Sequence, residues 1–347
     1  MSIYAPGVNE AEGAPRVLHE LRELTEPAIR QAVSRLQIGL ERVESYHRGW
    51  TTIDGQPQPR ASGKALRSAL AMLSVRAIEG EDRFGITAAV AVELVHDFSL
   101  LHDDLMDGDT LRRHRPTAWV AYGAGAAIVS GDALLALAIE LLLESGSPHT
   151  LEGIRLMNRC VSELIEGQAL DLEFESRRDV TLEDCRRMAA GKTAALLECA
   201  SALAALLGGA PKAQVDSLRG FGRELGMAFQ LVDDALGIWG DAEVTGKPVL
   251  SDLRARKKTL PITAALESGA KGLDSLRALM FSEGDAPGEL LEAAAQELSQ
   301  AGFRQWVLDE ARCHLKRAED HVDALGAPPF VKADLLELAR FVTFREL

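Results

Sequence analysis

The sequence predicts an all-α protein, and three observations support this fold class. Nearly every long segment of the 347-residue chain has apolar residues spaced three and four apart, and no segment shows the sustained alternation that a strand needs. Apolar residues make up 47% of the chain and charged residues 26%, which leaves ample material for a core. No Pro/Gly/Ser-rich linker interrupts the pattern, so a flexible N-terminus (1–15) and one domain (16–347) are expected.

The N-terminal half carries the first group of expected helices. Pro59 precedes the second of them and Pro116 precedes the fourth, as expected of a residue that interrupts helices. The most apolar stretch, Ala126–Leu143, contains Asp132 and Glu140, so we interpret it as a buried helix and expect no integral membrane segment. In chain order these helices are expected over 16–47, 61–79, 85–107, 118–145 and 150–175.

The C-terminal half continues the same spacing. Thr181 and Asp184 resemble a capping box that begins one helix, and Gly208, Gly209 and Pro211 end it. In chain order these helices are expected over 181–207, 211–239, 251–268, 287–300, 303–324 and 328–345. The residues after Pro261 carry no recognisable motif.

Charge and cysteine content limit the functional classes. The net charge of −14 argues against a broad basic surface for nucleic acid or anionic membrane, although it allows a local cationic pocket. The start of the chain lacks the order of a signal peptide, which predicts a cytoplasmic location. Four cysteines lie far apart, in no zinc-binding spacing, and are expected to be reduced: Cys160, Cys185, Cys199 and Cys313.

A first acidic cluster follows a strongly apolar helical stretch. Asp103 and Asp107 are four residues apart and so share one helix face, and Asp104 lies beside them. Such carboxylates can hold magnesium while water and substrate phosphates complete its coordination. The alternative is a helix end with solvated acids. Three carboxylates without a cation would repel one another, and a basic stretch, RRHR, begins at Arg112.

A second cluster repeats the order of acids followed by bases. Asp233 and Asp234 end another apolar helix, and Lys247, Lys257 and Lys258 follow. A lone pair of this kind is most often a helix cap. Two such helices facing each other across a cavity would instead form a clamp for a diphosphate.

Three shorter elements are unremarkable alone and most often solvated or structural. Each places polar residues close together on a helix. These pairs are Lys64 with Arg67, Gln168 with Asp171, and Lys192 with Thr193.

Together and in this order, the motifs resemble those of the trans-isoprenyl diphosphate synthase (polyprenyl synthetase) family. The resemblance extends from Gly63 to Pro261 and rests on GKALR, HDDLMDGDTLRRHRPT, GQALDLE, GKTAALL and FQLVDD with the following GD, TGK, SDLR and KKT. It implies a large antiparallel helical bundle around a deep central cavity, usually dimeric. It also implies a prenyltransferase that condenses isopentenyl diphosphate with an allylic prenyl diphosphate.

The resemblance also implies roles for individual residues. The acids Asp103, Asp104, Asp107, Asp233 and, with less support, Asp234 would bind magnesium. The allylic diphosphate would contact Arg112, Lys192, Lys247 and Lys258, supported by Gln168, Asp171, Thr193 and Gln230. Isopentenyl diphosphate would be held by Lys64, Arg67, His96 and Arg113. Catalysis would depend on Asp103, Asp104, Asp107, Lys192, Asp233 and Lys247.

One departure from the family pattern leaves alternatives open. Gly237 stands where the second motif usually has a third aspartate, and Asp241 is the nearest acid that could replace it. A class I terpene cyclase would also ionise an allylic diphosphate, but it would need no second diphosphate pocket. A non-catalytic subunit of a heteromeric synthase would catalyse no reaction. The presence of all four isopentenyl diphosphate residues favours condensation.

Product length is the last property that the resemblance addresses. Phe98 lies five residues before Asp103, and Ser99 four before, so Phe98 could form the floor of the cavity. An aromatic residue there with a small neighbour resembles geranylgeranyl-type enzymes more than farnesyl-type ones. The alternative is that Phe98 is ordinary core.

Overall fold

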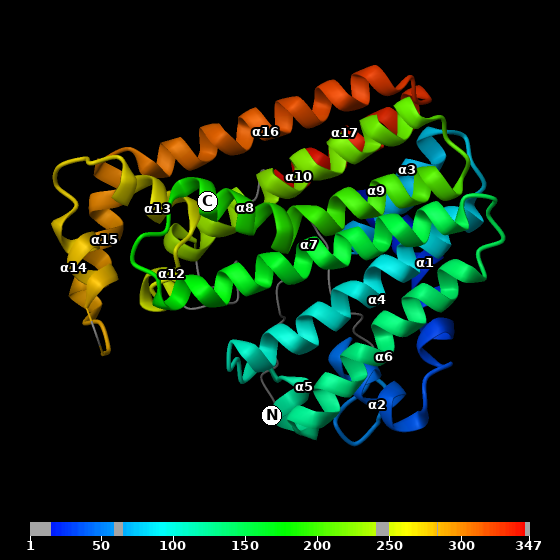
Figure 1. Ribbon diagram of the computed structural model, residues 1–347, viewed down its shortest axis with the longest axis horizontal. Helices are drawn as coiled ribbons and strands as arrows, with labels where there is room; N and C mark the ends of the chain where they lie inside the picture. The colour runs from blue at the N-terminus through cyan, green and yellow to red at the C-terminus, as the bar shows by residue number, and fades with distance from the viewer. Residues whose placement is uncertain (1–14, 59–64, 241–249, 283, 344–347) are drawn as a thin grey trace, which may run out of the picture.

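The computed structural model describes residues 15–58, 65–240, 250–282 and 284–343, and their fold is all-α, as predicted. The long helices run side by side along the molecule (Figure 1). In chain order the elements are α1 (Arg16–Val33), α2 (Ile38–His47), α3 (Leu66–Ala77), α4 (Asp82–Met106), β1 (Leu111–Arg112), β2 (Arg115–Pro116), α5 (Ala118–Tyr122), α6 (Ala124–Leu143), α7 (Thr150–Ser176), α8 (Leu182–Ala189), the π-helix η1 (Ala190–Ala194), α9 (Ala195–Leu207), α10 (Lys212–Trp239), α12 (Ser251–Arg254), α13 (Leu260–Glu267), α14 (Asp274–Phe281), α15 (Gly288–Gln300), α16 (Phe303–Leu325) and α17 (Pro329–Thr343).

The main core lies around α4 and α9. Both helices are apolar on nearly every side, as expected of helices in the centre of a bundle. α4 packs against α3, α6 and α9, while α9 also packs against α7 and α10. This arrangement places the C-terminal ends of α4 and α10, with their acidic residues, within one bundle.

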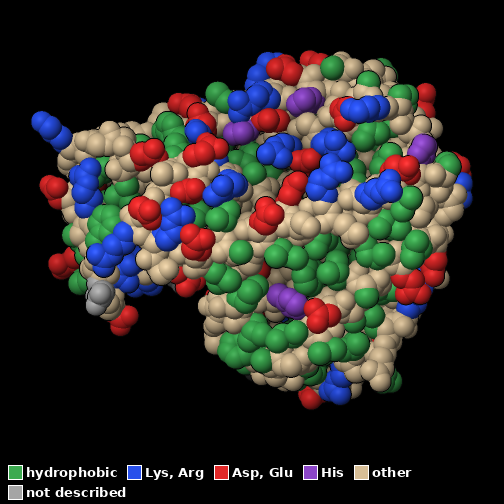
Figure 2. Space-filling model, in the orientation of Figure 1, with side chains coloured by type: hydrophobic (Ala, Val, Ile, Leu, Met, Phe, Trp, Pro, Cys, Tyr) green, Lys and Arg blue, Asp and Glu red, His purple; other side chains and the backbone are tan. Residues whose placement is uncertain are grey.

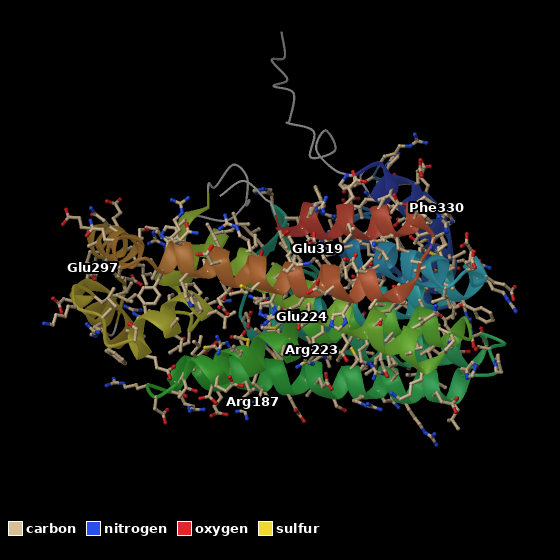
Figure 3. The ribbon with its side chains drawn as sticks, turned by 90° about the horizontal axis from the view of Figure 1, so that it is seen from above. Arg187, Arg223, Glu224, Glu297, Glu319 and Phe330 are labelled. Carbon is tan, nitrogen blue, oxygen red and sulfur yellow. The ribbon has the colours of Figure 1, made fainter. Side chains whose placement is uncertain are left out.

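A smaller core lies under α12 to α15. Ile238, Leu253, Leu276 and Leu291 are completely buried there. Figure 3 shows this end of the molecule, marked by Glu297, far from the end marked by Phe330.

The sequence predicted most helices but not all of their breaks. The expected helix 16–47 is interrupted between Val33 and Ile38, and the expected helix 118–145 is interrupted at Gly123, whose φ of 92° suits glycine. The expected helix 251–268 is two helices, α12 and α13, and the sequence analysis missed α14 and the β1–β2 hairpin. The predicted capping box of Thr181 and Asp184 is confirmed.

Three helical stretches are long and apolar enough to cross a membrane by length and composition alone. In Asp82–Met106 and Leu182–Leu207, 78% and 72% of the apolar window is buried within the fold, whereas the figure for Ala124–Leu143 is 39%. The prediction that this last stretch is a buried helix therefore holds for only one face. Figure 2 shows hydrophobic side chains gathered over α5 to α7 on the outer surface.

Candidate active site

Two acids of the first motif lie where α4 ends. Asp103 and Asp107 are one turn apart, and Asp107 is the C-cap of the helix. Burial, followed by the negative charges of Asp107 and Asp171, raises the pKa of Asp103 to about 6, although Lys192 opposes the shift. The groups that act on Asp103 therefore come from α4, α7 and η1, which meet at this point.

The middle acid of the motif has a different role. Asp104 is only 2% exposed, and Nε of Arg112 donates to both of its carboxylate oxygens, at 2.8 and 3.0 Å. Adjacent helix residues point about 100° apart, so Asp104 cannot share the face of Asp103. Its carboxylate holds Arg112 in place, and its predicted metal role stays a prediction.

The basic stretch after α4 folds as a hairpin. Arg112 pairs with Arg115 across β1 and β2, which leaves Arg113 and His114 as the turn. Their φ values are 51° and 62°, the left-handed values that a two-residue hairpin turn requires. Non-glycine residues in this region cost about 1–2 kcal/mol each. Such strain is concentrated at functional sites. Here the hairpin turn holds the backbone of Arg113 in this conformation.

Two predicted site residues, Lys192 and Asp171, form an ion pair. Nζ of Lys192 lies 2.5 Å from Asp171, because the π-helix η1 crosses α7 at two glycines. A Cβ on Gly167 would overlap the backbone of Lys192, and a Cβ on Gly191 would overlap the carbonyl of Glu163. The close contact between these backbones therefore sets where Lys192 projects.

A chain of hydrogen bonds links η1 to α10 and α13. Thr193 donates to Gln230, Gln230 Nε2 donates to Asp234 at 2.6 Å, and the backbone N–H of Leu260 donates to the other oxygen of Asp234 at 2.9 Å. Burial, followed by the charge of Asp252, raises the pKa of Asp234 to about 8. Asp234 thus connects two helices, and its metal role, like that of Asp233, stays a prediction.

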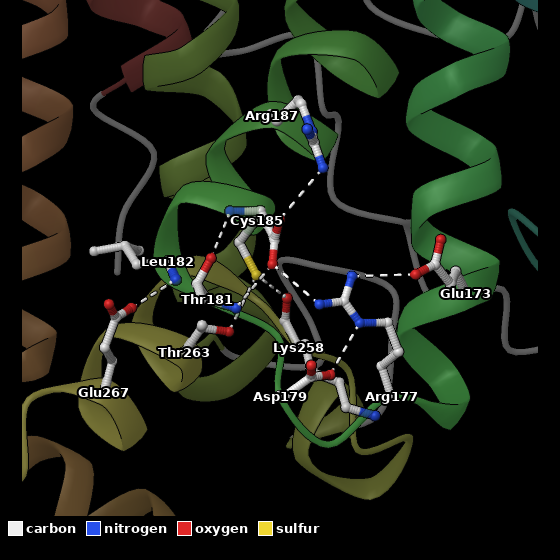
Figure 4. A network of polar contacts seen from close by, with 11 residues as sticks. Glu173, Arg177, Asp179, Thr181, Leu182, Cys185, Arg187, Lys258, Thr263 and Glu267 are labelled. Carbon is white, nitrogen blue, oxygen red and sulfur yellow. Dashed lines mark hydrogen bonds and ion pairs between the residues drawn. The ribbon is translucent and has the colours of Figure 1, made fainter.

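The two lysines before α13 point in different directions. Nζ of Lys258 donates to the carbonyl of Glu175 at 3.0 Å. The backbone carbonyl of Lys258 accepts from the Cys185 thiol (Figure 4). Burial lowers the pKa of Lys257, but acids on several elements raise it more, so the net shift is upward. In decreasing order of effect these acids are Asp171, Asp107, Asp252 and Asp109.

The acids of the site therefore act on Lys257, for which no role was predicted from the sequence, while the predicted diphosphate contact of Lys258 stays a prediction. The repeated lysines in KKT carry no periodicity that tells them apart. Because Lys257 is influenced by acids of α4, α7 and α12, the first acidic motif, Asp171 and Asp252 face a common space.

The Asp252 carboxylate lies directly against Gly237. A Cβ on Gly237 would overlap the Asp252 carboxylate, which comes from α12. The negative charge of Asp252 raises the pKa of Asp234 and also that of Lys257, which favours the charged form of the lysine. Asp252 therefore belongs to the same group of charges. The sequence analysis missed this residue, and its own candidate, Asp241, lies outside the described residues.

Three predicted isopentenyl diphosphate residues come together. Burial lowers the pKa of His96, and the positive charges of Arg67, Arg112 and Arg113 lower it further. Nε of Arg67 is buried and has no hydrogen-bond partner among the described residues. These groups form a cationic pocket in an otherwise acidic protein. Lys64 and Lys247, also predicted for diphosphate binding, lie outside the described residues.

The Gln168 side chain is buried and has no described hydrogen-bond partner. It is 7% exposed, and neither its amide nitrogen nor its amide oxygen has a hydrogen bond within the part of the chain that the structure describes. Buried amides are seldom left without partners, which is consistent with its predicted role beside a polar ligand.

The chain-length residues lie on different faces of α4. The Ser99 hydroxyl donates to the carbonyl of His96, and Ser99 shares the Asp103 face because it is four residues away. The Phe98 ring packs edge-on against His102, with 4.8 Å between ring centroids, and His102 packs against Gly131 of α6. Phe98 is buried, so both interpretations of this residue remain predictions for the product assay below.

The acids suit a hard divalent cation that is shared with a substrate. Among residues 15–58, 65–240, 250–282 and 284–343, no three histidine, cysteine or acidic side chains converge closely enough to hold a metal ion by themselves. Magnesium usually takes one or two carboxylates and completes its shell with water and phosphate oxygens. Asp103 and Asp107 on one side, with Asp233 on α10, fit that requirement.

Burial of His47 predicts a pH-dependent stability. Burial lowers the pKa of His47 below its ordinary 6.5, and nearby arginines lower it further, while Asp97 lies 4.0 Å away. A histidine with a depressed folded-state pKa stabilises the fold above pH 6.5, and this contribution is lost as pH falls toward the folded-state value. The arginines are Arg112, Arg113, Arg48 and Arg115.

We therefore expect the Tm of the wild type to fall more between pH 7.5 and pH 5.5 than that of His47→Gln, as about 1.4 kcal/mol accompanies each unit of pKa shift. Thermal unfolding followed by circular dichroism measures both values. Equal losses in the two proteins would contradict the prediction.

Comparison with known proteins gives one consistent family. The sequence pattern described as Polyprenyl synthetase matches residues 58–297. A Mycobacterium tuberculosis H37Rv protein named (2E,6E)-farnesyl diphosphate synthase is 45% identical over 333 residues, covering 95% of this chain and 93% of that protein. Another from the same strain, named Geranylgeranyl diphosphate synthase, is 40% identical over 322 residues, covering 92% of this chain and 91% of that protein.

Solved structures agree with this result. The polyprenyl synthetase of Streptomyces coelicolor A3(2) superposes with a TM-score of 0.89 at 44% identity, covering 94% of this chain and 98% of that one. A polyprenyl synthase of Caulobacter crescentus CB15, complexed with calcium and isoprenyl diphosphate, has a TM-score of 0.82 at 27% identity, covering 95% of this chain and 98% of that one.

Proposed function

Since this chain belongs to the polyprenyl synthetase family of trans-isoprenyl diphosphate synthases, it is a trans-prenyltransferase, and we propose that it joins isopentenyl diphosphate to an allylic prenyl diphosphate. The observation that carries the proposal is the common space between the acids of α4 and α12, with Lys257 among them. The comparisons give no support to a terpene cyclase or a non-catalytic subunit.

The allylic substrate would place its diphosphate between the acids of α4 and α10. Lys192, Lys257 and Arg112 supply positive charge for the departing diphosphate, and fixed charges of this kind lower the barrier to ionisation. The family uses a divalent metal, which we propose is magnesium here. When bound, the metal would neutralise diphosphate charge and favour its departure.

The second substrate would lie in the cationic pocket of Arg67, His96 and Arg113. Held there, the double bond of isopentenyl diphosphate faces the allylic carbon as the carbon–oxygen bond breaks. A carbon–carbon bond forms from the double-bond electrons, and one proton leaves with the released diphosphate. Water must be excluded from this space, because it would otherwise trap the allylic cation.

The proposal is tested with the purified protein, magnesium and isopentenyl diphosphate, plus dimethylallyl, geranyl or farnesyl diphosphate in separate reactions. Elongated prenyl diphosphates that form only when isopentenyl diphosphate is present would support it. Cyclic hydrocarbons from an allylic diphosphate alone, or no turnover of any substrate, would contradict it.

We propose geranylgeranyl diphosphate as the product, with farnesyl diphosphate as the second candidate because the 45% identical relative carries that name. If Phe98 limits the cavity, Phe98→Ala should yield products at least one five-carbon unit longer than those of the wild type. Chromatography of the dephosphorylated products measures this. Leu101→Ala, which also shortens a buried side chain of α4, is the control for loss of packing. An unchanged product length would show that Phe98 is ordinary core.

We infer that a second copy of this chain covers the exposed apolar face of α6. Val129 is 54% exposed and Leu143 is 63% exposed, and Leu151 and Ile165 of α7 add to this face. Patches of this kind mark interaction sites in soluble proteins. The other copy is the proposed occupant because the face continues over two long helices, as an extensive homodimer interface requires.

The cytoplasmic location and the lack of a nucleic-acid partner stay predictions from composition.

Val129→Glu is expected to convert a dimer to a monomer, because it places a charge within the apolar contact. Size-exclusion chromatography with light scattering measures the mass. Phe330→Glu is the matched control, because Phe330 is 69% exposed on α17, away from this face (Figure 3). A wild-type monomer, or a dimer that survives Val129→Glu, would contradict the inferred contact.

A further inference from the structure

A group of opposite charges is buried between α2 and α4. Arg48, the C-cap of α2, pairs with Asp97, and it also lies 2.9 Å from Glu44 and 3.6 Å from Glu93. The four side chains are between 0% and 12% exposed. Burying charged groups costs several kcal/mol per ion, and apolar residues often stabilise such a place equally well. Stability alone is therefore a weak explanation for this cluster.

The cluster extends to the first turn of α3. Oε1 of Glu93 accepts hydrogen bonds from the backbone N–H and the hydroxyl of Ser68, at 3.3 and 2.7 Å. Ser68 directly follows Arg67, whose buried Nε has no hydrogen-bond partner in the described part of the chain. The charges of Glu93 and Asp97 act on Arg67 in the direction that keeps it charged. The two acids thus favour the charged form of a guanidinium whose Nε has no acceptor among the described residues.

The same two acids are also linked to the other two residues of the pocket, His96 and Arg113. Glu93, His96 and Asp97 lie within one turn of α4, so whatever fixes the acids also fixes the backbone that carries His96. Asp97 and Glu93 act on Arg113 as well, opposing the effect of Arg112 on it. One buried cluster is therefore connected to residues from α3, α4 and the β1–β2 turn.

We propose that Asp97, held by Arg48, is a positioning residue for isopentenyl diphosphate: together with Glu93 it fixes Arg67, His96 and Arg113 in the arrangement that receives the homoallylic diphosphate. The inference rests on the proposed function. It concerns one of the two substrates, because the cluster lies behind the cationic pocket and makes no contact with Asp103, Asp107 or Lys192 among the described interactions.

Asp97→Asn tests this, since it removes one charge and keeps the shape of the side chain. We expect KM for isopentenyl diphosphate to rise about tenfold, because small displacements of binding groups cost up to about a hundredfold. KM for the allylic diphosphate should stay within about twofold of the wild type, as it reports a separate site. Titration calorimetry with isopentenyl diphosphate alone should show the same loss without turnover. Arg48→Lys keeps the charge but not the contacts with Glu44, Glu93 and Asp97, so KM for isopentenyl diphosphate should rise less. It replaces Asp97→Asn as the test if that variant does not fold.

Glu224→Gln is the matched control. Glu224 accepts from two basic side chains of α16, Nδ1 of His314 at 2.6 Å and Nε of Arg317 at 2.9 Å, and makes no described contact with Arg67, His96 or Arg113. It should lower Tm and leave both KM values unchanged. If Asp97→Asn behaves in that way, or raises both KM values equally, the inference is overturned. A wild type that does not condense the two substrates would instead overturn the proposed function.

Discussion

Asp103→Asn is expected to lower kcat by about a thousandfold or more, the scale on which removal of one group that stabilises transition-state charge acts. Asp103 lies one turn from Asp107 on α4, and the positive charge of Lys192 acts on it. Asparagine keeps the size of the side chain and removes the negative charge that a divalent cation needs. The measurement is single-turnover condensation at saturating magnesium and substrates.

A control separates this effect from damage to the helix. Asp82→Asn changes an acid at the other end of α4, where it pairs only with Arg76 among the described residues, and kcat should not change. The stabilisation of the wild type by magnesium with inorganic pyrophosphate, measured as a shift in Tm, should also be lost in Asp103→Asn. A variant that keeps kcat within about tenfold of the wild type would remove Asp103 from the proposed metal site.

Gly237→Asp is expected to impair the enzyme, although it restores the acid that the family pattern usually has there. The new side chain would overlap the Asp252 carboxylate and place like charges together, so we expect the unfolding free energy to fall by about 1–3 kcal/mol. We also expect kcat/KM to fall about a hundredfold, because displacing α12 moves Lys257. Urea denaturation and steady-state kinetics measure the two effects.

The double variant Gly237→Asp/Asp252→Gly tests the reason. Removing the Asp252 side chain vacates the space that the new aspartate needs, so most of the lost stability should return. Gly237→Ala adds volume without charge and should fall between the wild type and Gly237→Asp. If Gly237→Asp is as active and as stable as the wild type, the overlap with Asp252 does not constrain this position.

The sequence predicted the fold class and the pairing of site elements, but it could not resolve adjacent residues. Asp103 and Asp107 share a face by helix periodicity, and the predicted site residues Lys192 and Asp171 also meet, although the sequence did not pair them. Asp104 and Asp234 were grouped with their neighbours, although consecutive helix residues point about 100° apart. That difference was available from geometry alone.

Other features depend on contacts between distant segments. Lys257 and Lys258 differ only because the chain turns between α12 and α13, where the Lys258 side chain reaches the end of α7. Asp252 and Gly237 come together only when α12 packs on α10. Arg48 is a single charge in the sequence, and its partner Asp97 is 49 residues away. No local pattern marks such pairs, because the interaction exists only in the folded chain.

The π-helix η1 makes α8 and α9 two rods that are out of phase. Its wider turn takes up one residue more than an α-helical turn would, which rotates everything after it by about 100° relative to α8. Winding the same five residues as α-helix would advance α9 by about that angle and turn its apolar face out of the core. Deleting Ala190 or Ala194 as well would restore the present orientation of α9, without removing a charge from the site. For this segment, the number of residues matters as much as their identity.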